Sequence, residues 1–134
     1  MINELIEYQK QYNATISIKF SKINGYDIFL YNPDITVNSA SVIKIAIMVA
    51  LLEKVKENSL KLDKLIDFND HNLEDYEGVY SETDKKATIL ELITFMIINS
   101  DNMATNVLID LFGFDYFNEY FNDNNILFNS YRYN

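Results

Sequence analysis

The stretch from Val42 to Leu52 constrains the fold most, because every residue in it except Lys44 is apolar. A helix that is apolar on nearly all sides is buried in the middle of a domain. A single charge inside such a helix is costly unless it is paired or neutralised. We therefore expect a buried helix that begins at Ser39 or Ser41 and ends at about Lys56.

Length and composition limit the chain to a single ordinary domain. Its 134 residues are 49% hydrophobic, which is enough for a real core. The longest uncharged apolar run, Ile45–Leu52, is far too short to span a bilayer. The surplus of 20 acidic over 11 basic residues gives a net charge of −9, which excludes nucleic acid and anionic lipid as expected partners.

The residues that usually bind metals or form disulfides are scarce. The chain has no cysteine, and its one histidine, His71, cannot make a histidine-based zinc site. We therefore expect no metal and no organic cofactor. Acidic residues cluster between Asp63 and Asp84, where we expect a solvated, partly irregular surface.

The N-terminal segment predicts a helix followed by a β-hairpin. Residues 5–12 have an amphipathic helical pattern, and residues 15–20 alternate polar and apolar, as a half-buried strand does. Asn24-Gly25 is a strong turn signal, and residues 26–31 supply the returning strand.

The C-terminal half predicts further helices. Thr88 and Glu91 form a capping box that opens an apolar helix through Ile98. We expect two more helices, Met103–Leu111 with Gly113 as its C-terminal cap, and Tyr116–Phe121.

Ser41 and Lys44 have the spacing of a nucleophile and its base. Residues three apart on a helix share a face, so a proton can pass between them. A buried lysine has a lowered pKa and can then activate a serine hydroxyl. The alternative is that Lys44 extends from the first helical turn to the surface.

Ser100-Asp101-Asn102 interrupts two predicted helices and adds a hydroxyl, a carboxylate and an amide. By itself this triplet is also an ordinary helix cap. In combination with the earlier serine and lysine it matches the S-x-x-K and S-D-N signature of penicillin-recognising serine enzymes.

The two segments around these motifs resemble class A β-lactamases. Ser39–Ile45 (SASVIKI) is similar to their nucleophile helix, and Asn99–Ile109 (NSDNMATNVLI) to their S-D-N helix. The resemblance runs from the first helix to about Gly113. It implies an α+β, mainly helical fold, in which a helical domain lies beside a mixed α/β domain and the active site lies between them. Residues 1–36 would be the helix and hairpin of the α/β part, 37–121 the helical part and 122–134 a poorly defined tail.

The resemblance also implies roles for five residues. Ser41 would attack a β-lactam carbonyl and donate one oxyanion-hole N–H, while Lys44 would accept or hold its proton. Ser100 would relay a proton to the leaving nitrogen. Asn102 would bind the substrate amide and Lys44, and Asp101 would point inward to support the site. Tyr76 or Tyr80 would edge the cleft.

Some parts of the family pattern have no counterpart. No lysine follows Asn102, so the K-T-G strand is missing, and Glu119 lies in a helical pattern too early to be the deacylating glutamate. We expect these residues to be the N-terminal half of such a domain. The expected function is serine β-lactamase-like hydrolysis of β-lactam amide bonds, with this chain alone inactive or stalled at the acyl-enzyme.

Two alternatives remain open at this point. One is a penicillin-binding or D-Ala-D-Ala peptidase-like protein that takes a peptidoglycan-like peptide. The other is a non-enzymatic, degenerate helical binding module.

The family is usually exported, but the N-terminus has no signal-peptide pattern, so the compartment is left open. The open hairpin edge predicts possible self-association.

Overall fold

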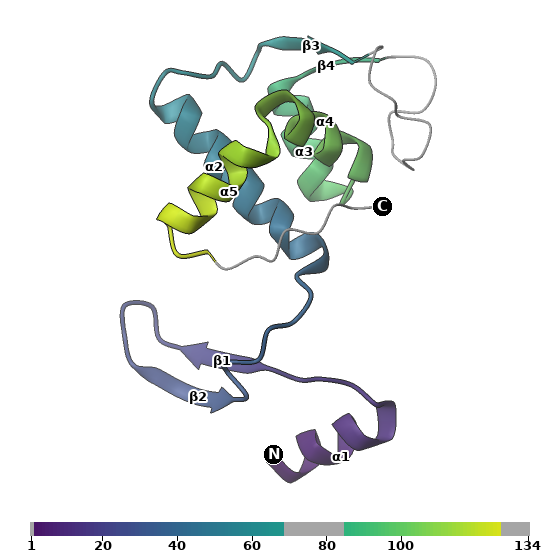
Figure 1. Cartoon of the computed structure of the whole chain (residues 1–134), viewed down its shortest axis with the longest axis vertical. Coiled ribbons are helices and arrows are strands. Elements are labelled where there is room, and N and C mark those ends of the chain that lie inside the picture. The colour runs from purple at the N-terminus through teal and green to yellow at the C-terminus, as the bar shows by residue number, and fades with distance from the viewer. Residues whose placement is uncertain (1, 69–84, 127–134) are drawn as a thin grey trace. The chain divides into compact units, whose positions relative to one another are not determined.

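The computed structural model describes residues 2–68 and 85–126. The chain divides into two units, Met1–Asn38 and Ser39–Asn134 (Figure 1). The first holds one helix and a hairpin, and the second holds the other helices. The predicted fold class, α+β and mainly helical, is confirmed.

The first unit consists of α1 (Ile2–Tyr12), β1 (Ile18–Ser21) and β2 (Asp27–Tyr31). The strands pair antiparallel, as the alternating pattern predicted, and both are shorter than predicted. The Tyr31 hydroxyl donates a hydrogen bond to Gln9 Oε1, which ties β2 to α1.

The turn between the strands has a backbone conformation that asparagine and glycine accept. Asn24 has a φ of 56°, in the left-handed region that asparagine tolerates. The Gly25 N–H donates to the Lys22 carbonyl at 3.1 Å, and a Cβ on Gly25 would come within 2.7 Å of Lys22 Cβ. Only glycine therefore fits this turn without a shift of the backbone.

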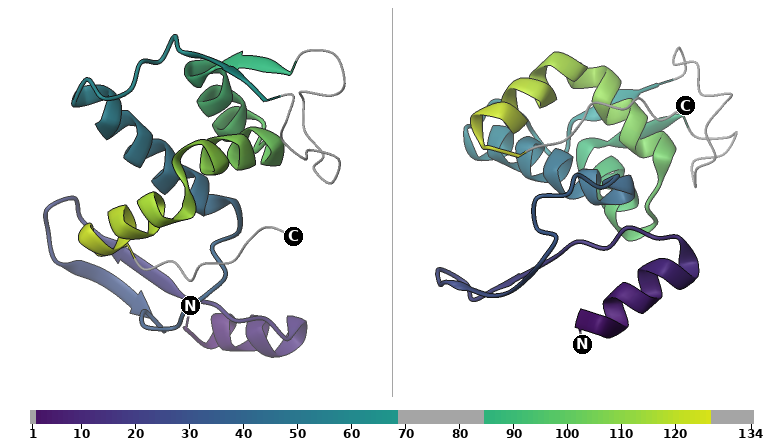
Figure 2. Two further views of the ribbon diagram at one scale, coloured as in Figure 1. Left: turned by 45° about the horizontal axis from the view of Figure 1, so that its top comes forward. Right: turned by 60° about the horizontal axis from the view of Figure 1, so that its bottom comes forward.

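The second unit is a group of helices with a short two-stranded sheet (Figures 1 and 2). Within its described residues, 39–68 and 85–126, a 3₁₀ turn and four helices follow in order, and the helices α3 and α4 pack side by side. The elements are η1 (Ala40–Val42), α2 (Ile43–Lys56), β3 (Leu65–Asp67), β4 (Lys86–Thr88), α3 (Ile89–Ile98), α4 (Asn102–Phe112) and α5 (Phe114–Asp123).

The antiparallel β3–β4 pair was not predicted, because each strand has only three residues and β3 lies within the acidic segment. The rest of that segment, with His71, Tyr76 and Tyr80, lies outside the described residues. None of the helices in residues 2–68 and 85–126 has the length and apolarity needed to cross a membrane.

Local caps set the start of α3 and the end of α4 as predicted, whereas the helix predicted from Ser39 or Ser41 is a 3₁₀ turn up to Val42 and α-helical only from Ile43. Thr88 Oγ1 accepts from the Glu91 N–H at 3.2 Å, while the Thr88 N–H donates to Glu91 Oε2 at 2.7 Å, which completes the capping box. Gly113 has a φ of 82° and ends α4, as a C-terminal glycine does. The last helix begins at Phe114 and runs to Asp123, so it is longer than predicted.

The core of the second unit forms where α2 packs against α3 and α5. Ile47, Ala50 and Leu51 lie on the buried side of α2. The prediction that this helix is buried all round is wrong for the described structure. A row of apolar side chains on the other side of α2, continued by Val42 of η1, is exposed: Val42 (61%), Ile45 (54%), Val49 (40%) and Leu52 (41%).

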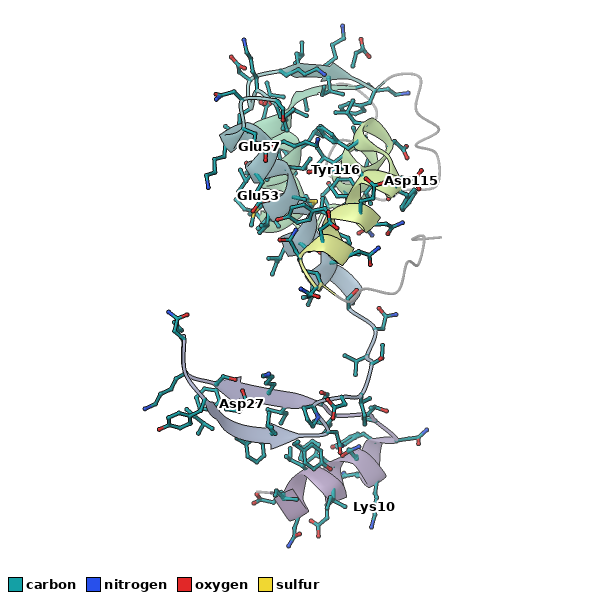
Figure 3. The ribbon with its side chains drawn as sticks, turned by 60° about the vertical axis from the view of Figure 1, so that its left-hand side comes forward. Lys10, Asp27, Glu53, Glu57, Asp115 and Tyr116 are labelled. Atoms are coloured by element: carbon teal, nitrogen blue, oxygen red, sulfur yellow. The ribbon has the colours of Figure 1, made fainter. Side chains whose placement is uncertain are left out.

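Tyr116 fixes α5 on α2 (Figure 3). Its hydroxyl donates to the Ala50 carbonyl at 2.9 Å, and Lys54 Nζ lies 4.0 Å from the centre of its ring. Burial, with smaller contributions from neighbouring groups that include Glu57 and Glu53, raises the pKa of Tyr116. The hydroxyl is therefore neutral at physiological pH and can donate this bond.

Candidate active site

Ser41 lies in the 3₁₀ turn that precedes α2. The Val42 N–H donates to the Ser39 carbonyl at 2.9 Å and closes the turn. Ala40 has a φ of 43°, a conformation that costs a non-glycine residue about 1–2 kcal/mol. The side chain of Ser41 is exposed, so its hydroxyl is accessible from solvent at the start of the helix.

Lys44 is buried, with 2% of its surface exposed, so it does not extend to the surface. Its Nζ donates to the Ser100 carbonyl oxygen, to Ser100 Oγ at 3.1 Å and to Asn102 Oδ1 at 2.7 Å. Burial lowers the pKa of Lys44, and the charge of Asp101 partly opposes this. The amine is therefore more easily deprotonated than an exposed lysine.

Ser100 joins the two motifs. Its backbone φ is 53°, which turns the chain between α3 and α4. Its Oγ donates to Ser41 Oγ at 2.8 Å and accepts from Lys44 Nζ. The hydrogen-bonded path from Lys44 to Ser41 therefore runs through Ser100, whereas the spacing of Ser41 and Lys44 alone predicted direct exchange.

Asp101 and Asn102 stabilise the start of α4, directly after the turn at Ser100. Asp101 is 4% exposed, and its Oδ1 accepts from the Ala104 N–H at 2.8 Å, which caps α4. Its carbonyl accepts from Thr105 Oγ1 at 2.6 Å. Asn102 begins α4, and its Oδ1 is used by Lys44. The structure thus brings all five predicted site residues into one cluster.

Sequence reasoning missed two features of this cluster. It did not foresee that the Ser100 backbone carbonyl would bind Lys44, since no side-chain pattern records it. It also assigned nothing to Asn106, whose buried Nδ2 makes no hydrogen bond with the described residues. The four-residue spacing from Asn102 was an available signal, because it places both amides on one face of α4.

The cluster can move a proton between an exposed hydroxyl and a buried amine. The described residues contain no group of acidic, histidine or cysteine side chains that could hold a metal ion. The hydrogen bonds among Ser41, Ser100 and Lys44 are compatible with a serine nucleophile and a lysine base.

The chain matches a known protein family. The sequence model of the β-lactamase enzyme family matches residues 1–131. Among curated protein sequences, none matches the chain.

Several solved structures share the fold. The β-lactamase of Sphaerobacter thermophilus DSM 20745 is 28% identical, with a TM-score of 0.72 over 88% of this chain and 45% of that one. An ancestral class A β-lactamase is 23% identical, with a TM-score of 0.78 over 90% and 47%. A class A β-lactamase representative from Bacteroides cellulosilyticus DSM 14838 is 23% identical, with a TM-score of 0.69 over 90% and 47%.

The chain spans about half the length of these structures, and the part it matches is their N-terminal half. The family match covers nearly the whole sequence. The chain therefore belongs to the β-lactamase enzyme family and has the fold of the N-terminal half of a class A β-lactamase.

Proposed function

We propose that this protein is a serine β-lactamase-like hydrolase in which Ser41 is acylated by β-lactams. The observation that carries the proposal is the hydrogen-bonded path from exposed Ser41 through Ser100 to buried Lys44. A serine hydroxyl needs a base to become a nucleophile, and a lysine with a lowered pKa is such a base.

In the proposed acylation step, Ser41, Ser100 and Lys44 carry the proton that leaves Ser41 and later reaches the leaving nitrogen. Ser41 Oγ forms a bond to the lactam carbonyl carbon, and its proton passes through Ser100 to the Lys44 amine. The lactam C–N bond then breaks, and Ser100 returns a proton to the leaving nitrogen. Asn102 Oδ1 is bound to Lys44, which leaves its Nδ2 hydrogens to donate to the substrate's amide carbonyl.

The proposal includes an acyl-enzyme that accumulates in this chain. In class A β-lactamases, which this sequence resembles, a loop glutamate activates the deacylating water. Among the residues after Asn102 the only glutamate is Glu119, and it lies in α5. We propose that these 134 residues, tested by themselves, acylate faster than they deacylate.

Intact-mass spectrometry after incubation with benzylpenicillin tests the proposal. We expect an adduct on the wild type and on Ser39→Ala, a control that removes a neighbouring hydroxyl outside the path. We expect none on Ser41→Ala. Circular dichroism of each protein verifies that it is folded. A folded wild type that forms no adduct, or a Ser41→Ala variant that forms as much, would contradict the proposal.

A further inference from the structure

The hairpin turn places a side-chain amide next to a backbone nitrogen that no side chain shields. Gly25 has no Cβ, so nothing attached to it blocks the approach of its nitrogen to Asn24 Cγ. Asn24 is exposed, and Ile23 in the same turn is 95% exposed, so water reaches this part of the chain. The turn therefore contains the groups that react in asparagine deamidation.

Deamidation at this position uses water and releases ammonia. The Gly25 nitrogen bonds to Asn24 Cγ, the Cγ–Nδ2 bond breaks, and ammonia leaves with the proton from the Gly25 nitrogen. The product is a succinimide ring. Water opens the ring at Cγ to give aspartate, or at the former main-chain carbonyl carbon to give isoaspartate, in which the chain continues through the side chain. Either product has one carboxylate in place of the amide.

One contact opposes this reaction. The Gly25 N–H donates to the Lys22 carbonyl at 3.1 Å, so the turn must open before the nitrogen can reach the Asn24 side chain. Among the described residues, β1 and β2 form a sheet of two strands only, with four and five residues. A sheet of this size is marginal in water, so its turn opens locally without unfolding of the rest of the chain.

Two other asparagines allow a comparison within the same chain. Asn13 and Asn58 are exposed and left-handed, with φ values of 48° and 58°, close to the 56° of Asn24. The N–H that follows each is also hydrogen-bonded to a backbone carbonyl, that of Ala14 at 3.1 Å and that of Ser59 at 3.0 Å. Only the residue after Asn24 lacks a side chain, so the approach to its amide is the least hindered of the three.

We propose that Asn24 is a site of spontaneous deamidation in the folded protein, and that its isoaspartate product opens the hairpin. Isoaspartate adds one atom to the main chain in a turn so tight that a Cβ on Gly25 would lie 2.7 Å from Lys22 Cβ. Because the turn sets the register of a hairpin, the added atom disturbs the pairing of β1 with β2. Aspartate accepts a left-handed φ as asparagine does, so it preserves the turn.

Peptide mapping of the wild type after days at mildly alkaline pH tests the site. We expect Asn24 to lose its amide, with aspartate and isoaspartate peptides both present, while Asn13 and Asn58 keep theirs over the same interval. A parallel sample in urea gives the rate in the unfolded chain. Equal loss at the three asparagines, or loss at Asn24 in urea alone, would overturn the inference.

Hydrogen exchange tests the effect on the hairpin. The isoaspartate form, separated from the aged protein, should lose protection of the β1 and β2 amides. Asn24→Asp is the matched control, because it has the added charge without the added chain atom, and it should retain the protection of fresh wild type. The α3 and α4 amides should be unchanged in both. Equal protection of the strands in the two forms would contradict the proposed opening.

Discussion

At the scale of single residues, two opposing effects act on the buried amine of Lys44. Burial makes its charged form costly, while the Ser100 carbonyl and Asn102 Oδ1 stabilise its hydrogens in either form. The net effect is a pKa below the ordinary value of 10.5, with burial as the largest cause and Asp101 opposing it. The same burial that costs stability thus makes the amine easier to deprotonate.

Lys44 should therefore make stability depend on pH. Between its lowered folded pKa and the unfolded value of about 10.5, the unfolded chain binds more protons at this position. The free energy of unfolding should rise with pH through this window, and the cost of the buried charge should be complete below it. Lys44→Met removes this contribution.

Urea denaturation at a series of pH values measures the effect as the difference between wild type and Lys44→Met. This difference should shift in favour of the wild type as pH rises toward 10.5. Lys56→Met is the control for loss of a lysine at the exposed end of the same helix. A difference that is constant across the window would contradict the expectation.

At the scale of elements, a local signal in the sequence determines where α3 begins. The capping box of α3 satisfies backbone groups with side chains only three residues away, so it was readable without tertiary structure. The β3–β4 pair was not readable, because its strands are short and pair across a long interval. Local hydrogen bonding is predictable where long-range pairing is not.

Thr88→Ala should lower the free energy of unfolding by about 1 kcal/mol, within the usual range for loss of an N-cap. Thr94→Ala is the matched control, since Thr94 Oγ1 only donates to the Leu90 carbonyl on the exposed surface of the same helix. Its effect should stay within about 0.5 kcal/mol. Urea denaturation of both variants checks this, and equal losses would count against the cap.

The capping box should also weaken in acid. The Thr88 N–H lowers the pKa of Glu91 from its ordinary 4.5, so the carboxylate contributes stability above that value. The contribution is lost as pH falls through the lowered pKa. The loss caused by Thr88→Ala should accordingly be smaller in acid than at neutral pH.

At the scale of the whole molecule, each unit leaves apolar side chains exposed. In the first unit Ile28 and Leu30, on one side of the hairpin, are 48% and 44% exposed. In the second unit the exposed apolar row of η1 and α2 extends from Val42 to Leu52. Open strand edges and apolar patches of this kind favour association.

We propose that the protein self-associates through the hairpin. Sedimentation velocity should show a larger species that grows with concentration. Replacing Ile28 and Leu30 together with lysine should shift the chain toward monomer. The control replaces Asn3 and Gln11, exposed polar residues of α1, and so adds the same charge elsewhere in the unit. Equal association of both double variants would contradict a role for the hairpin.

The sequence by itself predicted the helices, the hairpin turn and the caps, because these depend on patterns within a few residues, and its two motifs made Ser41, Lys44, Ser100, Asp101 and Asn102 candidates for a site. Only the tertiary structure decided how they meet. Packing of α2 against α3 brings Ser100 Oγ to 2.8 Å from Ser41 Oγ across 59 positions. It also buries Lys44 while leaving one side of α2 exposed, which an all-apolar pattern cannot reveal. Contacts between distant segments depend on which side of each helix packs against another helix. The order of residues along one helix does not contain that information.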